Sequence, residues 1–315
     1  MTLVARVRIR SRDTAGLILG ACLVWNGTTV CDAQVERATP TILSIPVSVR
    51  TAGLNGAGAA LVGDAAAFFS NPAGLATLSH IALEGAYRSL PGQGGSFNGA
   101  FAWRLRQFDL GLSGAYLDHG NDPTNFPPLG SPANSDARER MVMGSLVYRF
   151  GIIALGGTVK YVRIDADTAQ QRAISGDAGI AIAIFDIMAF GFSIQNIGDN
   201  WRGQSALDMP RLTRFGFTMN YVDPQESFRL LSTIEWQWPE GFSSRFIGGL
   251  EAGIVLSGVG IIGRGAYGSR PAGSQLSKFT VGGSVAISRL SLDYAYQPTD
   301  PWGRRAHRFG VRLTL

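Results

Sequence analysis

Apolar and polar residues alternate along most of the chain from about residue 79 onward. In one segment Phe97, Phe101 and Trp103 fall on one face, while Asn98 and Arg104 fall on the other. A period of two predicts β-strands with one apolar side and one polar side. The last segment of the chain keeps the same rhythm, with apolar residues at every second position: Phe309, Val311, Leu313 and Leu315.

The alternation divides the chain into about 14 candidate strands. They lie at 79–89, 95–105, 107–118, 137–150, 152–165, 173–185, 187–197, 211–221, 227–238, 244–256, 258–268, 276–287, 289–297 and 307–315. A strand of a soluble β-sandwich would alternate in the same way. The polar positions here hold small or charged side chains, however, which suit a water-filled lumen better than a dry core. The predicted fold class is therefore all-β, a transmembrane antiparallel β-barrel.

The connections between these segments alternate between very short and long. The short ones lie at Gln107, Gly151, Asp186, Ser257 and Ser288. Long, turn-rich loops include 119–136, 198–210 and 298–306. In outer-membrane barrels the short turns face the periplasm and the long loops face the cell exterior. We therefore expect a bacterial outer-membrane protein whose surroundings are membrane lipid, with both ends of the barrel on one side.

Composition agrees with strands rather than helices as the membrane-crossing elements. The chain is 45% hydrophobic and 16% charged and contains 41 glycines, yet it has no continuous apolar run of the roughly 18 to 20 residues that a transmembrane helix needs. The net charge of +5 does not indicate nucleic-acid binding. Four of the arginines lie at residues 6–12, and the other basic residues are dispersed among apolar ones. No nucleic-acid partner is expected.

The N-terminus has the pattern of a secretory signal. Arginines precede a short apolar stretch, and Cys31-Asp32-Ala33 offers a cleavage site that would make Gln34 the first mature residue. Residues 19–22, Leu-Gly-Ala-Cys, resemble a lipoprotein signal box, but they fall inside the apolar stretch rather than after it. Both cysteines lie in this segment, so the mature chain is expected to contain no disulfide and no reactive thiol.

Candidate catalytic chemistry is sparse. The three histidines, His80, His119 and His307, have no metal-ligand spacing to one another. A phospholipase barrel would need a serine and a histidine on neighbouring strands, whereas Ser79 and His80 are adjacent in the sequence. The segment 56–64, GAGAALVGD, lacks the Lys-Ser/Thr of a phosphate-binding loop. We expect no enzymatic activity, no metal and no cofactor.

The segment between the signal and the first strand is unlike the rest of the chain. Gly53, Gly56 and Gly58 predict a loop or tight bend, because glycine adopts positive φ without strain. Asp64 is predicted to cap a short helix that ends at Phe69.

A second short helix is predicted to begin at Pro72, with Ser70 or Asn71 as its N-cap. We divide the chain into a signal at 1–33, an N-terminal extension and hatch at 34–78, and a barrel at 79–315. The hatch precedes the first strand from the periplasmic side and is expected to lie inside the lumen. Its candidate gating residues are Asp64, Phe68, Phe69, Asn71, Pro72, Ala73, Gly74 and Leu75.

The hatch also carries a family resemblance, in Ser48, Arg50, Gly53, Gly56, Asp64, Ala65 and the run Asn71-Pro72-Ala73-Gly74-Leu75. Placed directly ahead of a barrel, these residues resemble the N-terminal motif of the PorV/PorQ family, which is grouped with the wider FadL-like barrels of 14 strands and an N-terminal hatch. Two further blocks, 194–221 and 290–315, are similar to that family as well. The resemblance covers nearly all of the mature chain.

This resemblance leaves three functions open. Likeness to PorV implies a role in type IX-like secretion, with secretion-system proteins or exported proteins bound at the long loops. Likeness to FadL implies passive uptake of a hydrophobic small molecule through a hatch-gated barrel. A mainly structural, porin-like role is the third. Family membership is a weak guide to activity, and the paired phenylalanines Phe68 and Phe69 would serve equally as lumen filling or as contacts for an apolar ligand.

Overall fold

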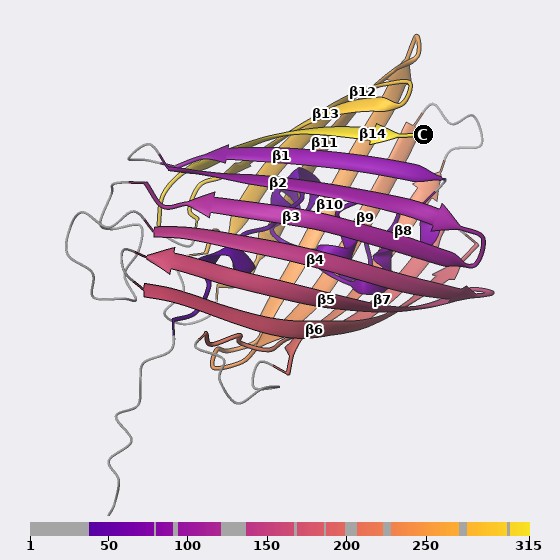
Figure 1. Ribbon diagram of the computed structural model, residues 1–315. Coiled ribbons are helices and arrows are strands. Elements are labelled where there is room, and N and C mark those ends of the chain that lie inside the picture. The colour runs from indigo at the N-terminus through magenta and orange to yellow at the C-terminus, as the bar shows by residue number, and fades with distance from the viewer. Residues whose placement is uncertain are drawn as a thin grey trace, which may run out of the picture. The chain divides into compact units, whose positions relative to one another are not determined.

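The computed structural model (Figure 1) describes residues 38–78, 80–90, 94–120, 137–166, 169–185, 187–198, 207–222, 228–270, 276–300 and 303–315. The predicted signal at 1–33 and the lipoprotein-like Cys22 lie outside these residues. So do Ser79 and most of the loops at 119–136 and 198–210.

Fourteen antiparallel strands form a closed barrel in which each strand pairs with its sequence neighbours and β1 pairs with β14. The strands are β1 (Ile81–Ser89), β2 (Gly95–Leu105), β3 (Phe108–Asp118), β4 (Ala137–Phe150), β5 (Ile153–Ala166), β6 (Ala169–Ile184), β7 (Met188–Ile197), β8 (Leu212–Val222), β9 (Phe228–Pro239), β10 (Arg245–Leu256), β11 (Val259–Gly268), β12 (Phe279–Ile287), β13 (Leu290–Gln297) and β14 (Ala306–Thr314). The predicted barrel is confirmed.

The wall has its apolar side outward. In β4 buried and exposed positions alternate almost without interruption, with Glu139 and Met141 inside and Val142 and Leu146 outside. In β14 the side chain of Phe309 is 57% exposed, whereas the neighbouring Arg308 is 2% exposed. An apolar outer surface around a polar interior is the arrangement of a barrel in lipid, because the lumen rather than the outer surface holds the polar groups.

The predicted strand bounds agree with the structure to within two residues except at two starts. β12 begins three residues later than predicted, and β6 begins at Ala169 rather than at 173. The β5–β6 ladder continues to the pair Ala166–Ala169, so the connection at this point is much shorter than predicted. Asp165 accepts hydrogen bonds from Arg163 and Gln170, and these polar contacts stabilise the extended hairpin. Periodicity missed this extension because the extra residues are polar on both faces.

The two ends of the barrel differ in their connections. We call one of them the short-turn end. There residues 106–107 join β2 to β3, residues 151–152 join β4 to β5, residues 257–258 join β10 to β11, and residues 288–289 join β12 to β13. The opposite, long-loop end carries the connections 119–136, 198–211, 269–278 and 298–305. Ile81 and Leu315 exchange backbone hydrogen bonds at the short-turn end, so both ends of the barrel lie on one side as predicted.

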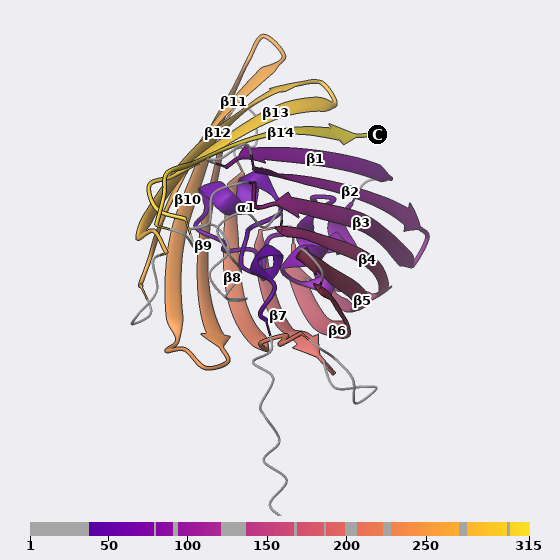
Figure 2. The same cartoon turned by 60° about the vertical axis from the view of Figure 1, so that its left-hand side comes forward.

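Four short helices precede β1: η1 (Thr41–Leu43), α1 (Val49–Gly53), η2 (Ala67–Phe69) and η3 (Pro72–Thr77). Figures 1 and 2 show these indigo and violet segments enclosed between the near and far strands. The loop predicted around Gly53 is wrong for residues 49–53, which form α1. Ser48 caps this helix by accepting a hydrogen bond from the backbone amide of Arg50 at 3.2 Å. Among the described residues no helix is both long and apolar enough to cross a membrane.

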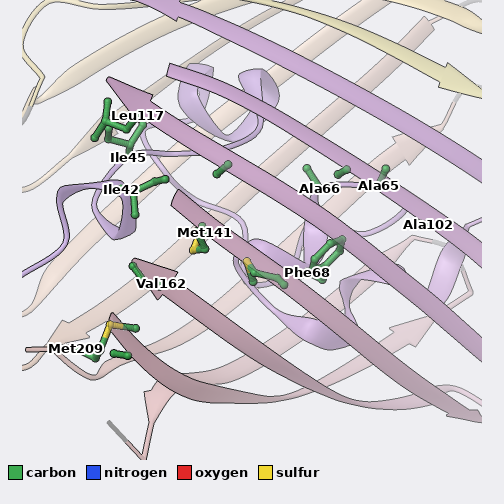
Figure 3. Packing of buried hydrophobic residues seen from close by; sticks show 14 of the residues in the cluster. Ile42, Ile45, Ala65, Ala66, Phe68, Ala102, Leu117, Met141, Val162 and Met209 are labelled. Atoms are coloured by element: carbon green, nitrogen blue, oxygen red, sulfur yellow. The ribbon is translucent and has the colours of Figure 1, made fainter. Parts of the chain in front are cut away.

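The largest apolar cluster lies inside the barrel, between the helical segment and the wall. Ile42 and Phe68 of the helical segment belong to one cluster with Leu117 of β3 and Met141 of β4, and Figure 3 shows Ile45 beside Leu117. Many other members are alanines, which let the segment approach the strands closely. The lumen therefore has its largest apolar core on the β2–β6 side, and two smaller apolar clusters lie elsewhere in it.

Candidate functional site: the hatch inside the lumen

Residues 38–78, which we call the hatch, run through the lumen from one end of the barrel to the other. Ala38 forms a parallel bridge with Leu207, in the β7–β8 connection at the long-loop end. Leu78 lies at the short-turn end, just ahead of β1. The hatch was predicted to come from the periplasmic side, where the short turns lie. Instead its first described residue lies at the long-loop end, because the side chain of Glu139, near the start of β4, holds η1 there.

Glu139 is fully buried and accepts three hydrogen bonds. Its carboxylate oxygens accept from the backbone amides of Thr41 at 3.1 Å and Ile42 at 2.8 Å. His119 Nε2 lies 2.9 Å from the Oε1 atom. The amides at the start of a helix carry a partial positive charge, so a carboxylate there is stabilising. Glu139 therefore anchors the first turn of the hatch to the wall.

Six charged side chains of alternating sign form a closed ring between the hatch and β10–β14. In order around the ring they are Arg50, Asp64, Arg312, Asp293, Arg264 and Glu251. Arg50 donates from Nε and Nη2 to the two carboxylate oxygens of Glu251, each at 3.0 Å, and from Nη1 to Asp64 Oδ2 at 2.7 Å. A two-point contact of this kind is the strong form of an arginine–carboxylate pair.

The wall completes the ring on its far side. Arg312 donates to both Asp64 and Asp293, at 3.1 Å from the latter. Arg264 Nε lies 3.2 Å from Glu251 Oε2 and Arg264 Nη1 lies 3.5 Å from Asp293 Oδ1. The ring contains three cations and three anions, so its charges balance. Balance is required here, because an unpaired buried charge is costly.

Asp64 has a different role from the predicted one. Its side chain caps no helix, and η2 begins later, at Ala67 with Ala66 as N-cap. Burial by itself raises the pKa of Asp64, but the guanidinium groups of Arg50 and Arg312 outweigh burial and hold that pKa well below its usual range. Burial likewise lowers the pKa of Arg50, and the carboxylates of Asp64 and Glu251 reverse the effect, so that it is raised. Both groups are charged in the folded protein.

A second carboxylate, Glu235 of β9, holds the middle of the hatch. Its Oε2 atom accepts from the backbone amides of Gly58 at 2.6 Å and Ala59 at 2.7 Å. Its Oε1 atom accepts from Arg214 at 3.1 Å and Gln237 at 2.6 Å. All four of these donors point at a carboxylate that is fully buried. At this point the polar face of the strands binds the backbone of the hatch.

The Asn-Pro step was predicted correctly. Asn71 is the N-cap of η3, accepting from the amide of Ala73 at 3.0 Å, and Pro72 occupies the first turn. The Asn71 amide also donates to the carbonyl oxygens of Ala59 at 2.7 Å and Ile180 at 3.1 Å. One side chain therefore closes a helix end, joins two parts of the hatch and ties both to β6.

Glycines in the wall let parts of the hatch lie in close contact with it. A Cβ atom on Gly191 of β7 would lie 1.8 Å from the carbonyl oxygen of Ala59, and one on Gly179 of β6 would lie 2.0 Å from Asn71 Oδ1. A Cβ on Gly156 of β5 would lie 2.6 Å from the amide of Ala73. Real Cβ atoms essentially never lie this close to another heavy atom. The hatch can therefore lie against β5–β7 only because these three positions are glycine.

The remaining predicted hatch residues fill space. Phe68 and Phe69 stack at 5.1 Å between ring centroids, and Phe68 and Leu75 both pack against Gly111 of β3. Ala73 is fully buried, and Gly74 lies where a Cβ would meet Ala67 and Leu61. All eight predicted residues thus lie in the hatch, where seven are buried and Phe69 is partly buried.

Two cavities lie beside the hatch at the short-turn end. One of about 190 Å³ is bounded by Leu61, Val62 and the wall strands β6–β9. The other, of about 380 Å³, lies between Val62, Ala76 and Thr77 of the hatch and β4–β7, with Arg104 and Arg149 on its lining. The larger exceeds the roughly 300 Å³ at which ligand pockets begin. Among the described residues no group of three or more His, Cys, Asp or Glu is arranged to hold a metal ion.

Sequence reasoning missed the wall residues that bind the hatch: Glu139, Glu235, Glu251, Arg264, Asp293 and Arg312. A signal was present. Each of them is a charged residue on the inward face of a predicted strand, and a charge that faces a lumen filled by protein needs a partner. What the sequence could not supply was the identity of the partner, since the paired residues are far apart along the chain.

No model of a known protein family matches the chain, so its resemblance to the PorV/PorQ family stays a prediction. The UPF0164 protein of Treponema pallidum (strain Nichols) is 30% identical over 159 residues, which cover 47% of this chain and 38% of that protein. The chain therefore matches well under half the length of this curated relative.

Solved structures show the fold. The toluene transporter TbuX of Ralstonia pickettii superposes with a TM-score of 0.57 at 13% identity, covering 90% of this chain and 99% of that one. A FadL homologue of Pseudomonas aeruginosa superposes with a TM-score of 0.57 at 13% identity, covering 88% of this chain and 98% of that one. The CymD monoaromatic hydrocarbon channel gives 0.57 at 11% identity, with 88% and 99% covered. The chain has a FadL-like fold, and together with the apolar outer surface this makes it a β-barrel protein of the outer membrane.

Proposed function

We propose that the protein is a channel for passive uptake of small hydrophobic molecules across the outer membrane, gated by the hatch. The observation that carries the proposal is a hatch whose helices contact β3–β7 on one side of the lumen and β11–β14 on the other, with two cavities beside residues 61–62 and 76–77 of the hatch. The similarity of the fold to proteins described as a toluene transporter and a monoaromatic hydrocarbon channel supports it.

The geometry favours motion of the inner part of the hatch. Leu61, Val62, Ala76 and Thr77 border the cavities, and the part of the hatch between them meets β5 and β6 through Asn71, Pro72 and the backbone of Ala73. The larger cavity is lined by apolar side chains, among them Ile152, Ile153 and Phe185, together with Arg104 and Arg149. An apolar solute that enters this space gains by leaving water. Displacing residues 61–77 would join the two cavities to the rest of the lumen.

Uptake by whole cells tests the proposal. The full chain is produced in a Gram-negative host that lacks its own channels for hydrophobic compounds, and initial uptake of radiolabelled toluene and of a radiolabelled disaccharide is measured. We expect toluene uptake to rise several-fold over the host alone and disaccharide uptake to stay unchanged. Deleting residues 65–75 should open the lumen and admit the disaccharide as well.

The matched control is Gly85→Ala, on the outer surface of β1, where an added Cβ meets no atom within 4 Å. It should behave as the unmodified chain in both assays. Toluene uptake equal to that of the host alone, with the barrel shown to be folded by its heat-dependent gel mobility, would count against the proposal.

The secretion role implied by the PorV/PorQ resemblance stays a separate prediction. Its expected binding surface, the long loops, lies largely outside the described residues. Genes for a type IX-like secretion apparatus beside this gene, with exported proteins that carry a shared C-terminal sorting domain, would favour it over uptake.

A further inference from the structure

A buried pair of arginines lies where the first and last strands close the barrel. Arg88 of β1 and Arg308 of β14 stand directly opposite each other in the ladder, and both face the lumen at 1% and 2% exposure. Asp300, in the connection that precedes β14, accepts a hydrogen bond from Arg88 Nη2. Two guanidinium groups thus share the neighbourhood of this carboxylate.

Arg308 is left with unused hydrogen-bond donors. Its Nη1 atom donates to the carbonyl oxygen of Pro46 in the hatch. Its Nε and Nη2 atoms are buried and have no hydrogen-bond partner among the described residues. Burying a charged group without partners for its donors is unfavourable, and an arginine presents these donors in a planar fork that suits an anion.

A third donor lies in the same cross-strand row. Ser96 of β2 stands opposite Arg88, is 2% exposed, and its hydroxyl group has no partner among the residues that the structure describes. On the other side of Arg308 the row continues with Ala295 of β13, whose small side chain adds no charge. Neighbouring strands are about 4.8 Å apart, so the row places donors of β1, β2 and β14 around one part of the lumen.

We infer that this row, with Arg308 at its centre, is a binding site for a compact monovalent anion. The anion would accept hydrogen bonds from the Nε and Nη2 atoms of Arg308 and from the hydroxyl group of Ser96. It would join β1, β14 and the hatch at Pro46, at the seam where the barrel closes. A free halide and a carboxylate group both have the required chemistry. The site is independent of the uptake proposed above.

Thermal unfolding of the full chain in detergent tests the inference. Chloride or acetate replaces gluconate, a bulkier anion, at constant ionic strength. A ligand that binds only the folded state raises the unfolding midpoint in a saturable manner. We expect such a rise in the unmodified protein and in Arg163→Gln, which removes a partly exposed arginine of β5, and an at least tenfold higher half-saturating concentration in Arg308→Gln.

A free inorganic anion and a carboxylate group give different responses in this experiment. A saturable response to chloride identifies a free inorganic anion, and a response to acetate alone identifies a carboxylate; either supports the site when Arg308→Gln abolishes it. If that variant does not fold, NMR line widths of chloride and of labelled acetate with the unmodified protein decide. Neither anion broadening beyond its value in buffer overturns the inference, and so does a saturable response that Arg308→Gln leaves unchanged.

Discussion

The hatch is held in two physically different ways on its two sides. Toward β10–β14 it is held by charge, through the ring in which Arg50 pairs with Glu251 and Asp64 pairs with Arg312. Toward β5–β7 it is held without charges, through close contacts that Gly156, Gly179 and Gly191 permit and through hydrogen bonds such as that from Asn71 to Ile180.

The difference matters for how each side could open. Ion pairs and hydrogen bonds can exchange partners when water enters, so the charged side can separate and reform without repacking. A steric contact has no such alternative, since interiors are close-packed and a displaced backbone leaves a void. The ring therefore determines how strongly the hatch is bound, whereas the glycines determine where it lies.

The largest loss of stability is expected from Arg50→Gln. The substitution removes a charge that pairs with both Asp64 and Glu251 and leaves two buried carboxylates short of a partner. Breaking a buried pair from one side costs about 3–5 kcal/mol. Chemical unfolding in detergent should report a loss of this size, and limited proteolysis should show cleavage within residues 38–78.

Arg211→Gln is the matched control for the ring. Arg211 pairs with Glu240, and their side chains are 60% and 57% exposed. Exposed pairs contribute about 0–1 kcal/mol. If Arg50→Gln destabilised the protein no more than Arg211→Gln, the ring would not be what holds this side of the hatch.

A smaller effect on stability, but a larger one on conductance, is expected from Gly191→Ala. The new methyl group would lie 1.8 Å from the carbonyl oxygen of Ala59, so the hatch must shift. Overpacking of this kind costs about 1–3 kcal/mol. In planar bilayers the variant should conduct measurably more than the unmodified chain, whereas Gly85→Ala should not. Equal conductance of all three would show that the contact with β7 does not seal the lumen.

The sequence was sufficient for the barrel wall because the wall is repetitive. A side chain that faces lipid must be apolar and its neighbour need not be, so Phe309 and Arg308 already indicate their faces. The local capping of η3 by Asn71 was equally readable, since a cap depends on residues two positions apart.

The contacts between the hatch and the wall could not be predicted from the sequence in this way. Arg50 and Glu251 are 201 residues apart, and nothing in either neighbourhood indicates the other. The same limit explains the error at Asp64, where a local cap was predicted and a long-range pair with Arg312 prevails. The direction in which the hatch enters the lumen also depends on such a pair, between Glu139 and the amides of η1.

The smallest effect is expected from acid. Because the pKa of Asp64 is lower in the folded protein than in the unfolded chain, its contribution to stability is complete above the unfolded value near 3.9 and is lost as the pH falls toward the folded value. Between pH 7 and pH 5 Asp64 should therefore change nothing. Below about pH 4 it should remove at most about 1.4 kcal/mol per pH unit. Comparing the unfolding free energy of the unmodified chain with that of Asp64→Asn isolates this term, because other carboxylates titrate in both. The two curves should run parallel above pH 5 and converge below pH 4; parallel curves throughout would mean that Asp64 gains no charge-dependent stability from Arg50 and Arg312.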